Sequence, residues 1–152
     1  MASLNGSTSY GTRLIIPPLR RVYAAFGDLT FALMRGIAGV ALMVHGYGKV
    51  TDPFAAVGMV ESLGFVPGTF WSPLLSFSEF FGGLLLALGL LTRPAAVAAS
   101  VILLVTIYYH WIFKDQGWSG SEKSILWVGM TLFFAVHGGG RFSVDRRIGK
   151  EF

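Results

Sequence analysis

The sequence predicts an all-α integral membrane protein, a polytopic four-helix bundle with both the N and the C terminus in the cytoplasm. Of its 152 residues, 53% are hydrophobic and only 13% are charged, whereas a soluble domain carries about 25% charged residues. Four apolar runs are long enough to cross a membrane, and Lys and Arg residues flank these runs. We therefore expect a multi-pass protein of a bacterial-type cytoplasmic (inner) membrane, surrounded by the lipid bilayer.

The four predicted spans follow one another along the chain. A helix needs about 20 mainly apolar residues to cross a hydrocarbon core of about 30 Å. The first run contains Arg35 and His45, the second contains Glu79, and the third carries no formal charge but has His110 near its end. The fourth run is slightly short. The predicted spans are residues 29–47, 73–91, 95–113 and 124–138.

These spans divide the chain into three parts. Residues 1–28 form an N-terminal cytoplasmic or interfacial segment, residues 29–140 the four-helix domain, and residues 141–152 a basic cytoplasmic tail. Within the first part, residues 20–26 are predicted to form either a short interfacial helix or a flexible tail.

The longest predicted outer loop is residues 49–70, and it is too apolar for a free loop. It predicts a short amphipathic helix over the outer mouth of the bundle, ending near Gly64 and Pro67. Small residues within the spans mark where lipid-embedded helices can pack closely. These are Gly36, Gly39, Gly82, Gly83, Ala95 and Ala99.

The distribution of basic residues predicts the orientation, because cytoplasmic loops carry the excess of Lys and Arg. Eight basic residues flank the spans on one side and three on the other. The first set is assigned to the cytoplasm. It consists of Arg13, Arg20, Arg21, Arg93, Arg141, Arg146, Arg147 and Lys150, and the second set of Lys49, Lys114 and Lys123.

Several classes of site are disfavoured. The sequence has no cysteine, which excludes disulfides, thiolate metal sites and covalent c-type haem. No pair of metal ligands stands at helical spacing on one face, so we expect no metal. No basic stripe with interleaved aromatic residues is present, so we expect no nucleic-acid partner. Common nucleotide-binding and hydrolase motifs are absent as well.

Ionisable residues within spans are candidates for function because burying them in a bilayer costs free energy. Counting about 1.5 Å of rise per residue places one group of them in the outer half of the bundle. Within this group, Glu79 would take up a proton if unpaired, whereas His45, Lys49 or Lys123 would keep it ionised. A purely structural role, fixing the helix register, is about equally plausible. The group contains His45, Lys49, Glu79, His110, Glu122 and Lys123.

The same depth estimate predicts an inner polar pair between Arg35 and His137, with Asp28 or Asp145 as further partners. The two histidines of the outer group lie at matched depth, which is also the arrangement of b-type haem ligands. Haem is the weaker interpretation, since many helix bundles place histidines at their ends without iron.

The ordered motifs of the chain resemble one known family. They are RGIAGVALMVHGYGKV, LGFVP, SEFFGGLLLALGLLTRPAA, the histidine of YYHW, SEKSILW and HGGGRFSVDR. Together they are similar to the DoxX family of small four-helix membrane proteins, over about residues 35–147. The residues that match the family pattern are Arg35, Gly39, His45, Gly46, Lys49, Glu79, Gly82, Gly83, Gly89, His110, Glu122, Gly140, Ser143 and Asp145.

The resemblance implies a membrane bundle that some members link to quinone-coupled sulfur oxidation. The first hypothesis is therefore a membrane subunit of a quinone-linked or other respiratory redox complex, with further membrane or redox subunits as partners. Glu79, His45 and His110 are the candidate catalytic residues. The candidate quinone contacts are Lys49, Phe80, Phe81, Phe113 and Glu122.

Two alternatives stay open at this point. The chain could be a non-catalytic accessory subunit that stabilises a larger membrane complex, which suits its small size and apolar faces. It could also be a small proton or solute transporter, because Glu79 with His45 has the composition of a proton relay. The sequence leaves open whether the chain is itself an enzyme.

Overall fold

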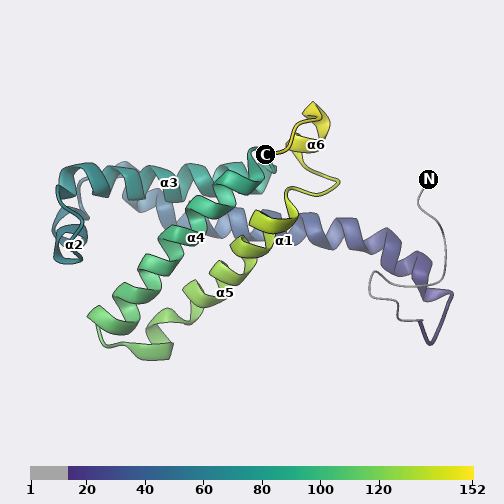
Figure 1. The fold of residues 1–152 in the computed structure, drawn as a ribbon, viewed down its shortest axis with the longest axis horizontal. Helices are drawn as coiled ribbons and strands as arrows, with labels where there is room; N and C mark the ends of the chain where they lie inside the picture. The colour runs from purple at the N-terminus through teal and green to yellow at the C-terminus, as the bar shows by residue number, and fades with distance from the viewer. Residues whose placement is uncertain (1–13) are drawn as a thin grey trace.

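The computed structural model describes residues 14–152, and every regular element in this part of the chain is helical. In this part of the chain, four long helices are connected by short segments and by three shorter helical pieces (Figure 1). Arg13 and the rest of residues 1–13 lie outside the described residues. The elements are α1 (Leu19–Thr51), α2 (Val57–Ser62), α3 (Gly68–Leu88), α4 (Thr92–Tyr108), η1 (Tyr109–Phe113), α5 (Gly117–His137) and α6 (Val144–Ile148).

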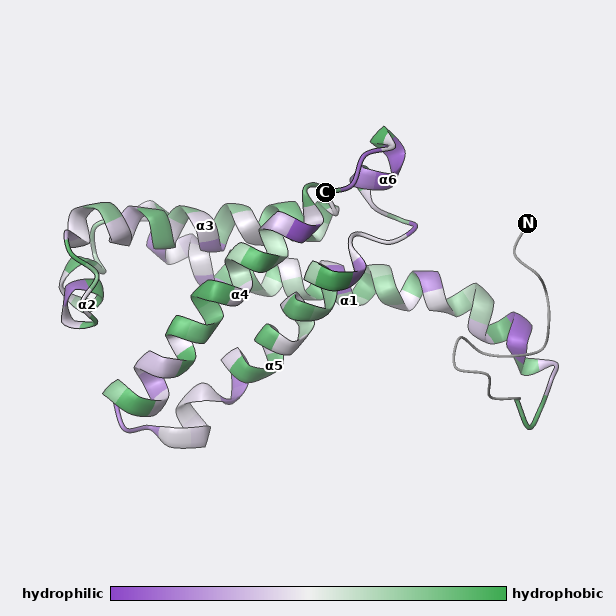
Figure 2. Cartoon of the chain, viewed as in Figure 1, coloured by the Kyte–Doolittle hydropathy of each residue, from purple (hydrophilic) through white to green (hydrophobic). Residues whose placement is uncertain are grey.

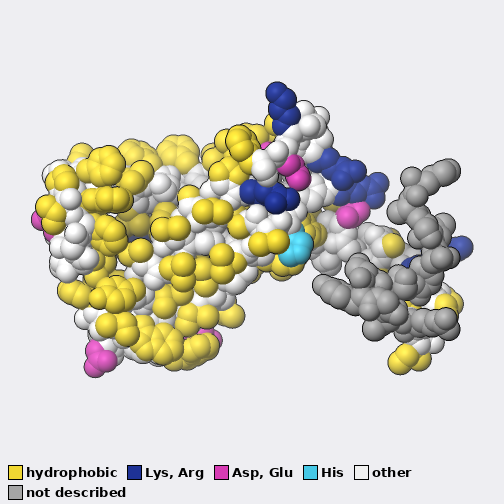
Figure 3. All heavy atoms as spheres, viewed as in Figure 1, with side chains coloured by type: hydrophobic (Ala, Val, Ile, Leu, Met, Phe, Trp, Pro, Cys, Tyr) yellow, Lys and Arg dark blue, Asp and Glu magenta, His cyan; other side chains and the backbone are white. Residues whose placement is uncertain are grey.

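The exterior of these helices is apolar, as expected for a protein surrounded by lipid. Apolar side chains cover most of the face shown in Figure 3, and hydrophobic residues run along all four long helices in Figure 2. Within residues 14–152, three helices are long and apolar enough to cross a membrane, namely α1, α3 and the continuous segment Thr92–Phe113. The fourth long helix, α5, has the required length with 21 residues. The predicted all-α polytopic membrane fold is confirmed.

Helix α1 is a single element of 33 residues, which corresponds to a length of about 50 Å. Its first turns extend beyond the rest of the bundle toward the N terminus (Figure 1). The prediction of a separate interfacial helix over residues 20–26 was therefore wrong, because these residues are the start of α1. Gly27 and Asp28 do not interrupt the helix between this part and the predicted first span.

The bundle is built from two helix pairs. Helix α3 packs along α1, while α4 and α5 run side by side at an angle to that pair (Figure 1). Close contact of α1 with α3 depends on glycine. A Cβ atom at Gly39 would collide with the backbone of Ala87 and lie 2.6 Å from the carbonyl oxygen of Gly83. Gly36, which shares the predicted small-residue motif, has open space instead.

Helices α4 and α5 contribute most of the apolar core, which Ala38 and Leu42 of α1 and Leu86 of α3 complete. Ala96, Ala99 and Leu103 on α4 pack with Val128 and Phe134 on α5. Within this apolar environment the hydroxyl of Ser100 donates to Oγ1 of Thr131 at 2.7 Å. This bond satisfies a buried polar group and fixes the register of the two helices.

The bundle has two structurally different ends, which we call the cavity end and the turn end. The cavity end consists of Lys49, α2, the first half of α3, η1 and the start of α5. Helix α2 is the short helix that the sequence predicted within residues 49–70. The turn end consists of the α3–α4 turn, α6 and the middle of α1. There, Gly89 has a φ of 70° and ends α3 with bonds from its own N–H to Leu86 and from Leu90 to Leu85, which is a Schellman motif.

Candidate functional site

Glu79 forms a buried ion pair with Lys49 at the cavity end. Helix α3 directs Glu79 toward α1 together with Ser76 and Gly83, which lie on the same face of the helix and are also buried. Glu79 is 7% exposed, and one of its carboxylate oxygens, Oε2, accepts a hydrogen bond from the Lys49 ammonium. Of the three partners considered from the sequence, the structure selects Lys49. The pair compensates two charges that would each be costly in a membrane interior.

Beside this ion pair lies a cavity of about 450 Å³. Its walls come from α2, α3, α4 and η1, and they are mostly apolar. Val101 on the wall is 56% exposed, so the cavity reaches the lipid-facing surface between α3 and α4. The polar and titratable side chains on its lining are Lys49, Ser78, Thr106, Tyr109 and His110, and the apolar lining includes Val60, Leu63, Phe65, Trp71, Leu75 and Val105.

His110 reaches the cavity from η1, the short π-helical segment at the end of α4. A π turn contains one more residue than an α turn and changes the direction of the side chains that follow. The Nδ1 atom of His110 lies 2.7 Å from Oε1 of Gln116. Sequence reasoning did not single out Gln116, because it lies in a short turn between two helices and belongs to no recognisable motif.

The remaining residues predicted for the outer polar group lie elsewhere. His45 is exposed and packs edge-on against Trp127, with ring centroids 4.7 Å apart. Glu122 and Lys123 are exposed on α5, which begins at Gly117 and is longer than the predicted fourth span. The structure thus brings Lys49, Glu79 and His110 to the cavity region and leaves the other three residues outside it.

The predicted aromatic contacts also differ from the observed cavity wall. The cavity lining does not include Phe80, Phe81 or Phe113. Phe80 and Phe81 pack against each other, and Phe80 also contacts Tyr47. Their positions on α3 were correctly assigned, but the direction in which each side chain points depends on the rotation of the helix, which the sequence does not reveal.

The turn end contains a second buried polar cluster, centred on Arg35. This residue is 3% exposed and donates to the carbonyl oxygens of Leu86, Ala87 and Phe142 at 2.8 to 2.9 Å. Two of these carbonyls belong to the last turn of α3, where helical carbonyls lack partners. Arg35 therefore caps α3 and ties it to the segment before α6.

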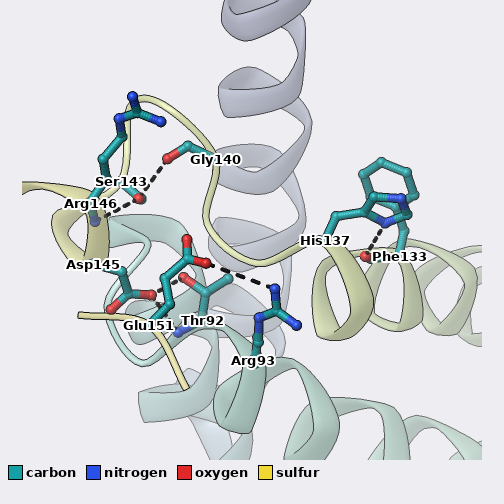
Figure 4. Close-up of polar contacts among 9 residues, drawn as sticks. All are labelled: Thr92, Arg93, Phe133, His137, Gly140, Ser143, Asp145, Arg146 and Glu151. Atoms are coloured by element: carbon teal, nitrogen blue, oxygen red, sulfur yellow. Dashed lines mark hydrogen bonds and ion pairs between the residues drawn. The ribbon is translucent and has the colours of Figure 1, made fainter. Parts of the chain in front are cut away.

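The predicted pairing of Arg35 with His137 was wrong. His137 is exposed at the end of α5, where its Nδ1 atom lies 2.8 Å from the carbonyl oxygen of Phe133 (Figure 4). Asp28, considered as a further partner, instead accepts from Arg141 at 3.0 Å. Arg35 and His137 both lie at the turn end, but an estimate of depth gives no information about which way each helix face points.

Asp145 on α6 completes the cluster at the turn end (Figure 4). Its carboxylate accepts from the amides of Leu91 and Thr92 and from the Thr92 hydroxyl, at 2.7 to 2.9 Å. Burial raises the pKa of this carboxyl, but the hydrogen bonds from Thr92 and Leu91 and the charge of Arg35 outweigh that effect, so the pKa lies below its ordinary value. Asp145 thus caps the start of α4 as Arg35 caps the end of α3.

Among residues 14–152, no group of three His, Asp or Glu side chains is arranged to hold a metal ion. The two polar clusters that the structure does contain differ in kind. In the cluster at the turn end, Arg35 and Asp145 bond mainly to backbone groups of the α3–α4 turn, which indicates a structural role. The cluster at the cavity end adjoins open space, which makes it the candidate functional site.

Comparison with known proteins places the chain in a family. The profile of the DoxX family matches residues 30–113, a segment that contains Arg35, Lys49, Glu79 and His110. The chain belongs to the DoxX family. It is also 32% identical over 127 residues to the Inner membrane protein YqjF of Escherichia coli (strain K12), a match that covers 82% of this chain and 96% of that protein. No solved structure matches the chain.

Membership of the DoxX family and the three apolar helices both indicate that the protein lies in a membrane. The chain is a multi-pass protein of the bacterial inner membrane. The motifs that carried the resemblance lie at both ends of the bundle. HGYGK supplies Lys49 to the ion pair, SEFFGG supplies Glu79, and SVDR supplies Asp145 to the turn end.

Proposed function

We propose that this DoxX-family protein binds the headgroup of a membrane quinone in the cavity between α3 and α4, as the membrane subunit of a quinone-linked redox complex. The observation that carries the proposal is the combination of groups on the cavity lining. An ammonium group, Lys49, and an imidazole, His110, adjoin otherwise mainly apolar walls. The ammonium can donate to a ring oxygen, the imidazole can bond a ring hydroxyl of the reduced form, and the apolar walls suit an isoprenoid tail.

The size and position of the cavity support this ligand class. Ligand sites typically enclose about 300 to 1,000 Å³ and combine apolar walls with a few placed polar groups, and this cavity has about 450 Å³. Exposed wall residues such as Leu74 and Val101 place its opening on the lipid-facing surface. A quinone dissolved in the bilayer would reach the site laterally, with its tail remaining among acyl chains.

The ion pair supports a role in proton handling. Lys49 is shared between the cavity and Glu79, since it lines the first and donates to the second. Its side chain is 39% exposed, whereas that of Glu79 is 8% exposed. A proton released or taken up by a bound headgroup would therefore have Lys49 as its nearest charged neighbour and Glu79 behind it. Electron transfer to or from the quinone is assigned to a partner subunit.

A binding titration tests the proposal. The protein, reconstituted in nanodiscs, is titrated with decyl-ubiquinone while tryptophan fluorescence is recorded, because Trp71 on the cavity wall would be quenched by a bound quinone. We expect saturable quenching that the Trp71→Phe substitution largely removes. For the reduced form, decyl-ubiquinol, measured by competition against the quinone, His110→Leu should weaken binding about tenfold, the equivalent of one lost hydrogen bond of about 1.4 kcal/mol.

The controls use matched changes outside the cavity. His137→Leu makes the same substitution at an exposed histidine of the turn end and should leave the affinity unchanged. Lys49→Met is combined with Glu79→Gln, so that no buried charge is left without a partner. Quenching that does not saturate, or a quinol affinity that His110→Leu and His137→Leu change equally, would contradict the proposal.

A further inference from the structure

The hydrogen bond between His110 and Gln116 determines which nitrogen of the imidazole carries the hydrogen. Nδ1 of His110 faces the amide oxygen of Gln116 at 2.7 Å. An amide oxygen can only accept, so Nδ1 must donate. In a neutral imidazole the other nitrogen is then a bare acceptor. Nε2 has no protein partner within residues 14–152 and belongs to a side chain that lines the cavity.

Gln116 is itself held in place by three features of the short turn before α5. Its backbone N–H donates to the carbonyl oxygen of His110 at 3.0 Å, and its own carbonyl accepts from Gly120 at 3.4 Å. A Cβ atom at Gly120 would lie 2.6 Å from the Gln116 side-chain oxygen. The absence of a side chain at Gly120 therefore provides the space in which the Gln116 amide reaches His110.

The second polar group of the cavity has the opposite hydrogen-bonding character. The Lys49 ammonium has three N–H groups and no acceptor. Glu79 is the one hydrogen-bond partner that its ammonium has among the described residues, so donors remain for a ligand. The cavity thus offers an acceptor at His110 and a donor at Lys49.

This pairing distinguishes the two redox forms of the proposed ligand. Both ring oxygens of a quinone are carbonyls, which can only accept, so one of them would face the lone pair of Nε2. A quinol carries hydroxyl groups, which can donate to Nε2 and accept from Lys49. We propose that the cavity binds the reduced quinol more tightly than the oxidised quinone, with Gln116 as the positioning residue that sets the tautomer of His110. The inference rests on the proposed quinone site.

The tautomer can be tested without any ligand. In protein with ¹⁵N-labelled histidine, NMR distinguishes an imidazole protonated at Nδ1 from one protonated at Nε2. The chain has three histidines, and His137 serves as an internal reference because its Nδ1 faces a backbone carbonyl. We expect His110 to show the Nδ1–H form, and to lose it in Gln116→Leu and in Gly120→Ala. An Nε2–H form of His110 in the unaltered protein would overturn the inference.

The preference is tested by binding decyl-ubiquinol and decyl-ubiquinone under anaerobic conditions. We expect the quinol to bind about tenfold more tightly, which raises the midpoint potential of the bound two-electron couple by about 30 mV. Gln116→Leu should bring the two affinities close together, and Gln116→Glu, which keeps an acceptor opposite Nδ1, should retain the preference. Ser119→Ala, an exposed position of the same segment, is the matched control.

The outcomes separate this inference from the proposed function. Equal binding of both forms by the unaltered protein would overturn the selection of quinol and leave the quinone site standing. Binding of neither form would overturn both. A preference for quinol that Gln116→Leu does not change would show that the tautomer of His110 is not its cause.

Discussion

The side chain of Asp145 accepts hydrogen bonds from both the backbone amide and the hydroxyl of Thr92, at 2.9 and 2.7 Å. This relationship joins α6 to the first residue of α4. Arg35 stands on the other side of the same turn and binds the final carbonyls of α3. A cation at a helix C terminus and an anion at a helix N terminus are both favourable, so the two charges together stabilise the reversal of direction between α3 and α4.

Asp145→Asn should destabilise the protein. The amide nitrogen of asparagine would direct a donor toward donors of Leu91 and Thr92, leaving buried groups without partners at a cost of about 1–3 kcal/mol. Unfolding in detergent, followed by circular dichroism, measures the loss. Glu151→Gln is the control, because its ion pair with Arg93 is 3.8 Å long and partly exposed. It should cost less than about 0.5 kcal/mol. Equal effects of the two changes would contradict this account.

The same residue predicts a dependence of stability on pH. Because the folded pKa of Asp145 lies below its ordinary value, the unfolded chain binds more protons in that range. The contribution of Asp145 is therefore fully present above an ordinary Asp pKa of about 3.9 and is lost as the pH falls through the folded pKa. Unfolding measured between pH 6 and pH 3 should show a smaller loss in Asp145→Asn than in the unaltered protein, and identical profiles would refute the assignment.

Gly39→Ala and Gly36→Ala form a matched pair one turn apart on α1. A methyl group at position 39 would collide with the backbone of α3, whereas position 36 has open space. Alanine favours a helix over glycine by up to about 1 kcal/mol. Gly36→Ala should therefore be neutral or stabilising, and Gly39→Ala should lower the melting temperature by separating α1 from α3. A melting temperature unchanged in Gly39→Ala would mean that the two helices do not pack at this point.

Removing the charge of Lys49 should destabilise the protein more than removing the charge of Glu79. Lys49→Met leaves a buried carboxylate without a cation, at a cost of about 3–5 kcal/mol. Glu79→Gln leaves a partly exposed ammonium that can turn toward water, and should cost less. The double substitution should be more stable than Lys49→Met alone, and unfolding of all four proteins measures the coupling. Strict additivity would show that the pair does not interact.

The orientation of the chain in the membrane stays a prediction. The structure shows which end of the bundle this prediction assigns to the cytoplasm. Arg93 meets Glu151, and Arg141 meets Asp28, so basic residues distant in sequence gather at the turn end (Figure 3). The rule for cytoplasmic Lys and Arg then places both termini in the cytoplasm. Alkaline phosphatase fused after the last residue should be inactive, and a fusion within the α2 region should be active. The reverse pattern would invert the topology.

The sequence predicted what depends on distance along a helix. The lengths of the apolar runs predicted the all-α membrane fold, and the apolar character of residues 49–70 predicted the short helix α2. The estimated depth of each residue placed Glu79 and Lys49 at a similar height in the bundle. It could not predict what depends on rotation about the helix axis. Arg35 turns toward α3 because glycines bring α1 against that helix, while His137 faces outward, and no count of residues distinguishes these directions.

The missed parts of the candidate site have a related cause. Gln116 became relevant only because a π turn and a short connection bring it to His110. Thr106, Ser78 and Tyr109 are ordinary residues of apolar helices, and only the angle between α3 and α4 makes them part of a cavity. Local patterns do not encode that angle, since it results from the packing of two helix pairs.

Photo-labelling reports where a quinone lies in the membrane and therefore tests whether it binds in the cavity between α3 and α4. Native membranes containing the protein are illuminated with an azido-quinone, and labelled peptides are identified by mass spectrometry. We expect label on the cavity wall, at Trp71, Val101 or Tyr109, and we expect excess decyl-ubiquinone to abolish it by competition. Label confined to the exposed outer face of α5, for example at Leu126 or Leu132, would contradict the proposal.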